Sequence, residues 1–70
     1  MRTLDLHGVK HEDVDEKVRK FLNFVELPCN IITGKSPEMK KIVEDIVIEY
    51  EWSFYEKDSW NTGTLVVTEK

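Results

Sequence analysis

The sequence is poor in cysteine, glycine, proline and long apolar runs: among its 70 residues are one cysteine, three glycines and two prolines, and its longest apolar run is three residues. The lone Cys29 cannot form an internal disulfide, and no Cys/His spacing is typical of a zinc site. A membrane helix needs about 20 consecutive apolar residues, and no basic segment followed by an apolar one opens the chain. We therefore expect a cytoplasmic protein without a membrane span, organised as a single domain over residues 1–70.

Size and charge exclude further classes of function. A chain of this length buries only about 60% of the surface that it exposes when unfolded, which excludes a large multi-layer enzyme. The net charge is −4, but residues 1–41 carry eight basic and seven acidic residues, and residues 42–70 carry two basic and seven acidic ones. Affinity for long duplexes comes from neutralising many phosphates, so this acidity argues against indiscriminate duplex binding. A local phosphate site in the first half stays open, and the acidic second half would suit a basic protein partner.

The spacing of apolar residues predicts four strands and two helices. Two stretches have apolar residues at steps of three and four, which is typical of amphipathic helices. The first contains Val14, Val18, Phe21, Leu22 and Val25, and the second contains Met39, Ile42, Val43, Ile46, Val47 and Tyr50. Alternating or β-branched runs predict strands over Met1–His7, Cys29–Thr33, Trp52–Lys57 and Thr64–Glu69, with a turn over Ser59–Gly63 between the last two.

The order of these elements predicts the fold. Two consecutive strand–helix–strand units require right-handed parallel crossovers, and the short last connection favours an antiparallel hairpin. Because each helix has only one apolar face, we expect both to cover one face of a four-stranded mixed sheet. The predicted fold is an α/β two-layer sandwich of order βαβαββ whose other sheet face is open.

The first polar motif is Leu4–Gly8, at the end of the first predicted strand. Asp5 and His7 are two residues apart, so on a strand their side chains would leave the same face about 7 Å apart at the backbone. A carboxylate beside an imidazole can fix its tautomer, which suits a general acid or base. The alternative is a structural hydrogen bond at a strand end, followed by the turn residue Gly8.

The second polar motif is Thr33–Ser36, between a strand and a helix N-terminus. Such a junction offers free backbone N–H groups to an anion, and Lys35 adds a full charge. Gly-Lys-Ser also ends the P-loop, but that loop needs a glycine at the position that Cys29 occupies. The alternative is an ordinary turn with Ser36 as helix cap, Pro37 at the first helical position and a solvated lysine.

The two motifs follow the carboxyl ends of the first two strands, where ligands bind in open α/β sheets. We therefore expect Asp5, His7, Lys35 and the amide of Ser36 to converge on one phosphate. Further basic residues are expected to surround this site and contact flanking phosphates: Arg2, Lys10, Lys40 and Lys41.

Taken together, three segments resemble the small MutS-related (Smr) domain. They are Leu-Asp-Leu-His-Gly at 4–8, Ile-Ile-Thr-Gly-Lys-Ser at 31–36 and Gly-Thr-Leu-Val-Val at 63–67. The resemblance covers Thr3 to about Thr68 and implies a fold similar to the C-terminal domain of translation initiation factor three. The family includes endonucleases that nick or cut structured DNA and endonucleases that cut RNA. The chain departs from the family at Ser36, where a glycine is usual, and at Lys10, where a polar cap is frequent.

The resemblance implies phosphodiester cleavage, with a catalytic set of Asp5, His7 and Lys35. His7 would act as general acid or base, Asp5 would orient it, and Lys35 with the loop amides would stabilise the developing negative charge. The expected phosphate-binding residues are Arg2, Gly8, Lys10, Thr33, Gly34, Ser36 and Lys40.

The identity of the substrate decides whether a metal is needed. In RNA the 2′-hydroxyl is an internal nucleophile, so no metal or other cofactor is required. In DNA water must attack, and a divalent ion such as Mg²⁺ or Mn²⁺ held by Asp5 fits better. One carboxylate and one imidazole make a poor metal site, so the residue set favours RNA.

Two other functions stay open: a non-catalytic nucleic-acid binder that uses the same pocket, and a protein-interaction module. The second would use the acidic C-terminal half and Trp60, which we expect to be exposed at the last turn. We expect Trp52 and either Phe54 or Tyr55 to be structural, and Cys29 to be a small buried hydrophobe. The chain is expected to be a monomer.

Overall fold

The computed structural model describes residues 2–57 and 63–69 of the chain. It contains β1 (Arg2–Asp5), α1 (His11–Phe24), β2 (Cys29–Ile32), α2 (Pro37–Glu49), β3 (Ser53–Glu56) and β4 (Thr64–Thr68). The predicted order βαβαββ is confirmed, although every strand is shorter than expected. Most of the predicted turn over Ser59–Gly63, and Trp60 with it, lies outside the described residues.

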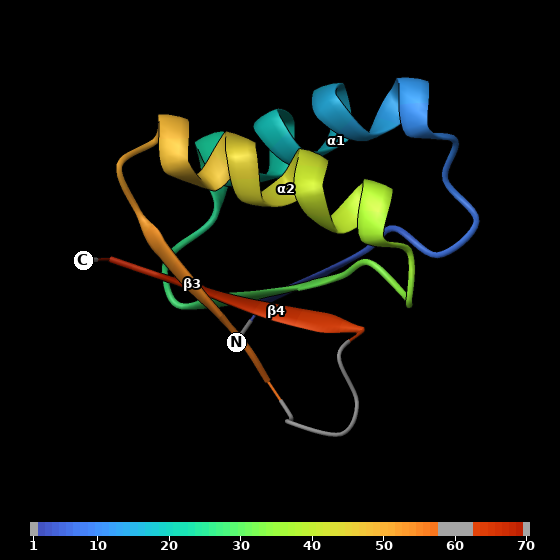
Figure 1. The fold of residues 1–70 in the computed structure, drawn as a ribbon. Coiled ribbons are helices and arrows are strands. Elements are labelled where there is room, and N and C mark those ends of the chain that lie inside the picture. Colours follow the sequence, from blue (N-terminus) through green and yellow to red (C-terminus); the bar gives the residue numbers. More distant parts are fainter. Residues whose placement is uncertain (1, 58–62, 70) are drawn as a thin grey trace.

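The four strands form one mixed sheet in the order β1-β2-β4-β3. β1 is parallel to β2, whereas β4 is antiparallel to both β2 and β3. Both helices cover the same face of this sheet, and the described segments leave the other face open (Figure 1). The α/β two-layer sandwich expected from the sequence is therefore confirmed.

One cluster of buried side chains lies between the helices and the sheet. It takes the predicted stripes of both helices together with alternate residues of the strands: Leu6, Val14, Val18, Leu22, Cys29, Ile31, Met39, Val43, Ile46, Val47, Leu65 and Val67. Cys29 is fully buried, as expected for a small hydrophobe, and burial raises the pKa of its thiol to about 11.

The aromatic residues of the hairpin divide between the two faces of the sheet. Trp52 and Phe54 pack against the core, and the ring of Trp52 lies 5.1 Å from that of Tyr50. Tyr55 alternates with Phe54 and is 56% exposed. Of the two residues that the sequence left open, Phe54 is therefore the structural one.

The ends of α2 follow from local sequence. Ser36 is the N-cap and its Oγ accepts a hydrogen bond from the Met39 N–H at 3.2 Å, with Pro37 at the first helical position. At the other end Glu51 has φ 62°, a left-handed conformation that a side chain disfavours, and its N–H donates to the carbonyl of Ile48. This turn directs the chain back into β3.

The two helices are also linked on their solvent side. The guanidinium of Arg19 lies 2.8 Å from a carboxylate oxygen of Asp15 and 2.7 Å from one of Glu49. These two carboxylates raise the pKa of Arg19 above its ordinary value. Neither of the described helices is long and apolar enough to cross a membrane.

Candidate functional site

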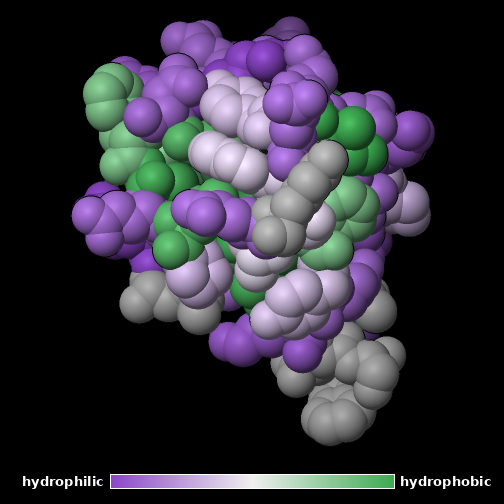
Figure 2. Space-filling view, turned by 90° about the vertical axis from the view of Figure 1, so that its left-hand side faces the viewer, coloured by the Kyte–Doolittle hydropathy of each residue, from purple (hydrophilic) through white to green (hydrophobic). Residues whose placement is uncertain are grey.

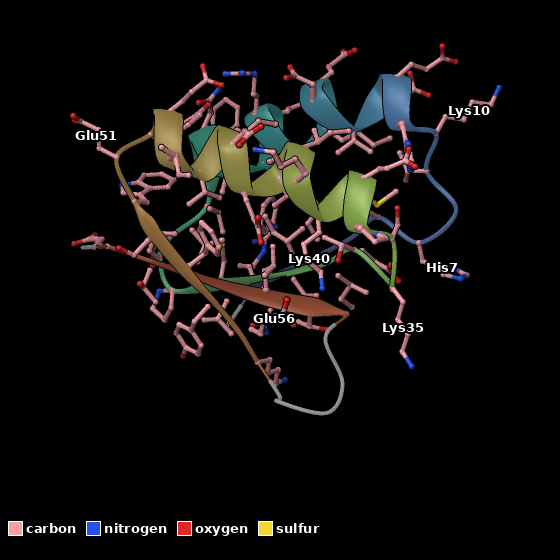
Figure 3. The ribbon with its side chains drawn as sticks, in the orientation of Figure 1. His7, Lys10, Lys35, Lys40, Glu51 and Glu56 are labelled. Carbon is pink, nitrogen blue, oxygen red and sulfur yellow. The ribbon has the colours of Figure 1, made fainter. Side chains whose placement is uncertain are left out.

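The two polar motifs lie side by side at one end of the sheet. Asp5 and Ile32 are register partners and end the parallel strands β1 and β2. The loops that follow lead into the N-terminal turns of α1 and α2, and the side chains of His7, Lys10 and Lys35 project from this end (Figure 3). The fold thus brings together eight of the predicted residues: Asp5, His7, Gly8, Lys10, Thr33, Gly34, Lys35 and Ser36.

The loop after β1 is a tight turn that begins earlier than the sequence suggested. The N–H of Leu6 still donates to the carbonyl of Ile32 at 2.9 Å, but the N–H of Val9 already donates back to the carbonyl of Leu6 at 2.9 Å. Gly8 has φ 81°, as the third residue of a type II turn requires. His7 is therefore an exposed turn residue, and the prediction that it extends the strand beside Asp5 is wrong.

The turn changes the partner of Asp5. Its Oδ1 accepts a hydrogen bond from the backbone N–H of His7 at 2.8 Å, whereas we expected it beside the imidazole. The reason is that a side chain at a strand end reaches the amide two residues later once the chain turns. Asp5 therefore fixes the backbone from which the imidazole of His7 projects into solvent.

The loop after β2 is held to the start of β4. The N–H groups of Thr33 and Gly34 both donate to the carbonyl of Gly63, at 2.9 and 3.1 Å. The hydroxyl of Thr33 donates to the carbonyl of Gly34 at 2.9 Å, and Thr33 is buried. Thr33 and Gly34 thus shape the loop, and their amides do not face a ligand as we expected.

Free hydrogen-bond donors remain at the beginning of α2. The backbone N–H groups of Lys35, Ser36 and Glu38 have no acceptor within residues 2–57 and 63–69, and Pro37 has no N–H. The ammonium of Lys35 is exposed and has no carboxylate partner in the same part of the chain. This helix terminus therefore presents amides, a dipole and a full positive charge to an anion.

A second imidazole lies at the same end. Nδ1 of His11 is 3.5 Å from a carboxylate oxygen of Glu38, so the first turns of α1 and α2 are in contact. The sequence indicated no partner for His11, because the two residues are 27 positions apart in the chain.

Three of the predicted phosphate contacts lie elsewhere. Arg2 begins β1 and is three residues, or about 10 Å of strand, from Asp5. Nζ of Lys40 lies 2.9 Å from a carboxylate oxygen of Glu56, and its side chain is only 18% exposed beneath α2 (Figure 3). Lys40 is therefore neutralised against β3, because the hairpin brings Glu56 under the helix. Lys41 pairs with Asp45 on the outer face of α2.

Within the described part of the chain, no group of three or more His, Cys, Asp and Glu side chains could hold a metal ion. No protein-family model matches the chain, and neither a curated protein nor a solved structure matches it. The resemblance to the Smr domain consequently depends on the three sequence segments and on the order of the elements.

Proposed function

We propose that this end of the sheet binds a phosphodiester group of a nucleic acid and cleaves it, as Smr-like endonucleases do. The observation that carries the proposal is the free donor set at the start of α2, which lies at the same end of the sheet as the exposed imidazole of His7 (Figure 3). Lys35 and the amides of Lys35, Ser36 and Glu38 would hold the phosphate. Their fixed positive charge would stabilise the negative charge that develops on it.

His7 is the proton-transfer group in this proposal. In RNA it removes the proton of the 2′-hydroxyl, whose oxygen attacks the adjacent phosphorus and expels the 5′-oxygen, which takes up a proton from water. Asp5 is a positioning residue, since it acts on His7 only through the backbone amide. The cleavage products are a 2′,3′-cyclic phosphate and a free 5′-hydroxyl.

DNA lacks the internal nucleophile, and a divalent ion would be needed to activate water. Mg²⁺ prefers several oxygen ligands, but Asp5 already uses one carboxylate oxygen for the His7 amide, and the described residues include no metal-holding cluster. The residues present do not fit a metal by themselves, so RNA is our preferred substrate. We place the activity in the cytoplasm, where the free thiol of Cys29 would stay reduced, and expect a monomer.

The test compares cleavage of a labelled structured RNA with that of single-stranded and branched DNA, in EDTA and in Mg²⁺ or Mn²⁺. We expect cleavage of RNA in EDTA, and its loss in His7→Ala. Lys35→Gln should mainly raise KM, because it removes a charge that holds the phosphate, while Lys41→Gln on the outer face of α2 serves as the matched control. Cleavage that survives His7→Ala would refute the proposal.

A second candidate is a nucleic-acid-binding module without catalysis. It is favoured by one observation: the Asp5 carboxylate contacts the His7 amide and not the ring, so within residues 2–57 and 63–69 no hydrogen bond orients the imidazole. Binding by the wild-type chain that is weakened by Lys35→Gln, with no cleavage of any substrate, would support this candidate. The protein-interaction alternative depends on Trp60, which is outside the described residues.

A further inference from the structure

A groove of about 390 Å³ runs beside the edge strand β1 and meets the candidate site at Asp5. β1 has a neighbour on one side only, because it ends the strand order. The groove lies between this free edge and α1, and its lining combines cations with apolar side chains: Arg2, Leu4, Asp5, Lys17, Lys20, Phe21, Phe24 and Val25. In Figure 2, apolar side chains on the left of the view are bordered by hydrophilic ones.

The α1 side of the groove is a single stripe of side chains. Lys17, Lys20, Phe21 and Phe24 are spaced at i, i+3, i+4 and i+7, so they share one face of the helix. Phe21 is partly buried against the core, whereas Phe24 is 85% exposed. The stripe therefore presents flat apolar rings next to two ammonium groups.

The cations of the groove are free, unlike most others near the helices. Arg19, Lys40 and Lys41 each pair with a carboxylate, but Arg2, Lys17 and Lys20 have no such partner in the part of the chain that the structure describes. Three acids lie close by: Asp5 at one end of the groove, and Asp13 and Glu16 in an adjoining hollow that they share with the two lysines. The lining of the groove itself thus carries three cations and one carboxylate, Asp5, and is net positive.

The dimensions of the two walls agree. From Arg2 to Asp5 the strand rises about 10 Å, and from Lys17 to Phe24 the helix rises about 10 Å. The end at Asp5 is shared with the candidate site, so a chain that leaves the groove there passes the His7 turn. A ligand of the groove is therefore placed to be the substrate of the site.

We propose that this groove, formed by β1 and α1, binds an unpaired stretch of the nucleic-acid substrate, an inference that rests on the proposed function for the identity of its occupant. The bases lie against Phe21 and Phe24, and the phosphates contact Arg2, Lys17 and Lys20. Only an unpaired strand offers its base faces to aromatic rings, and three cations with exposed rings are the elements of a single-strand platform. A duplex would hide those faces and would require more phosphate contacts than the groove supplies.

Binding is tested in the His7→Ala background, so that cleavage does not consume the probe. Fluorescence anisotropy would compare a labelled single-stranded oligouridine with a duplex RNA of the same length at fixed salt. Phe24→Ala should weaken single-strand binding about 5- to 100-fold, the range found when one base loses its aromatic partner. The double variant Lys17→Gln/Lys20→Gln should reduce the slope of log affinity against log salt by about 1.4, since each phosphate contact contributes about 0.7.

Two matched controls separate the groove from the rest of the surface. Ile48→Ala removes an apolar side chain on α2 that is 59% exposed, and Lys41→Gln removes an exposed charge there. Both should leave single-strand affinity unchanged. Phe24 is exposed at a helix end, so unchanged thermal unfolding of Phe24→Ala is expected and would exclude misfolding as the cause of weaker binding.

The outcomes distinguish the groove from the proposed function. Groove-dependent binding without cleavage by the wild-type chain supports the groove and refutes the endonuclease. Cleavage that depends on His7 but is unaffected by the groove variants overturns the groove and leaves the endonuclease standing. Equal affinity for duplex and single strand overturns the inference. Binding of an acidic extended peptide along the β1 edge, with no binding of either RNA, overturns it as well.

Discussion

The replacement of Asp5 by asparagine tests how this residue acts on His7. Asparagine keeps a side-chain oxygen that can accept the His7 backbone N–H, which Asp5 Oδ1 accepts at 2.8 Å, but it removes the negative charge. If Asp5 acts only through that amide, cleavage by Asp5→Asn should stay within about tenfold of wild type. If the carboxylate instead oriented the imidazole, the same change would cost about 10⁴-fold, as it does where a carboxylate holds a catalytic imidazole.

The alanine variant supplies the magnitude of the amide contact. Asp5→Ala removes the acceptor, and the loss of one exposed hydrogen bond of this kind is worth about 1 kcal/mol. In a chain of this size that corresponds to a fall in Tm of about 4–8 °C, and to about a fivefold loss of rate if the turn must be formed in the transition state. Asp5→Asn should lower Tm by less.

The assay is single-turnover cleavage of the labelled RNA together with thermal unfolding by circular dichroism. Asp45→Asn is the matched control, since Asp45 is an exposed carboxylate on α2 that pairs with Lys41. A loss of more than about 10³-fold in Asp5→Asn with an unchanged Tm would refute the reasoning, because the charge itself would then take part in catalysis.

Three further predictions concern the scaffold. Glu51→Gly should stabilise the chain by about 0.5–1 kcal/mol in urea unfolding, because glycine adopts the left-handed conformation at φ 62° without the strain of a side chain. The control Glu16→Gly, within α1, should destabilise the chain by about 1 kcal/mol. Equal effects of the two substitutions would contradict the explanation. Ser36→Ala should cost about 1 kcal/mol by removal of the cap on Met39, whereas Ser36→Gly should cost only a few tenths, which denaturation midpoints would resolve. Burial raises the pKa of Cys29 from 9.0 to about 11, so at pH 8 its thiol should react with a disulfide reagent far more slowly in the folded chain than in the unfolded chain. The stability that this shift contributes is complete below pH 9 and is lost as the pH rises towards 11. Fast reaction of the folded chain would argue against burial.

The parts of the fold that the sequence predicted are those specified by neighbouring residues. The start of α2 follows from Ser36 and Pro37, whose capping roles depend on two or three adjacent positions. The buried stripes follow from helical periodicity, and the placement of both helices on one face follows from their single apolar sides. No long-range information was needed for any of these.

The errors arose where a contact depends on residues far apart in the chain or on the geometry of a turn. Lys40 and Glu56 are 16 positions apart, and only the return of the hairpin beneath α2 brings them together. The period-two pattern around His7 resembled a strand, but a type II turn needs only one glycine in the correct place to end it, and Gly8 supplies that. The pattern therefore predicted the wrong geometry for His7.

The two loops of the candidate site are fixed by different means, and this separates their chemical roles. The loop after β2 is held next to the start of β4, because the carbonyl of Gly63 accepts both the Thr33 and the Gly34 amide. Of the loop and helix-start amides in the described residues, those of Lys35, Ser36 and Glu38 are left to hold an anion. The loop after β1 is held by the backbone hydrogen bonds of Leu6 and Val9 and by the Asp5 carboxylate, which accepts the N–H of the residue that carries the exposed imidazole. Under the proposed function, phosphate binding would belong to the β2 side and proton transfer to the β1 side, and a substrate would bridge both. The groove between β1 and α1 opens on the proton-transfer side, so a strand held there would bring its phosphate to His7 before it reached Lys35.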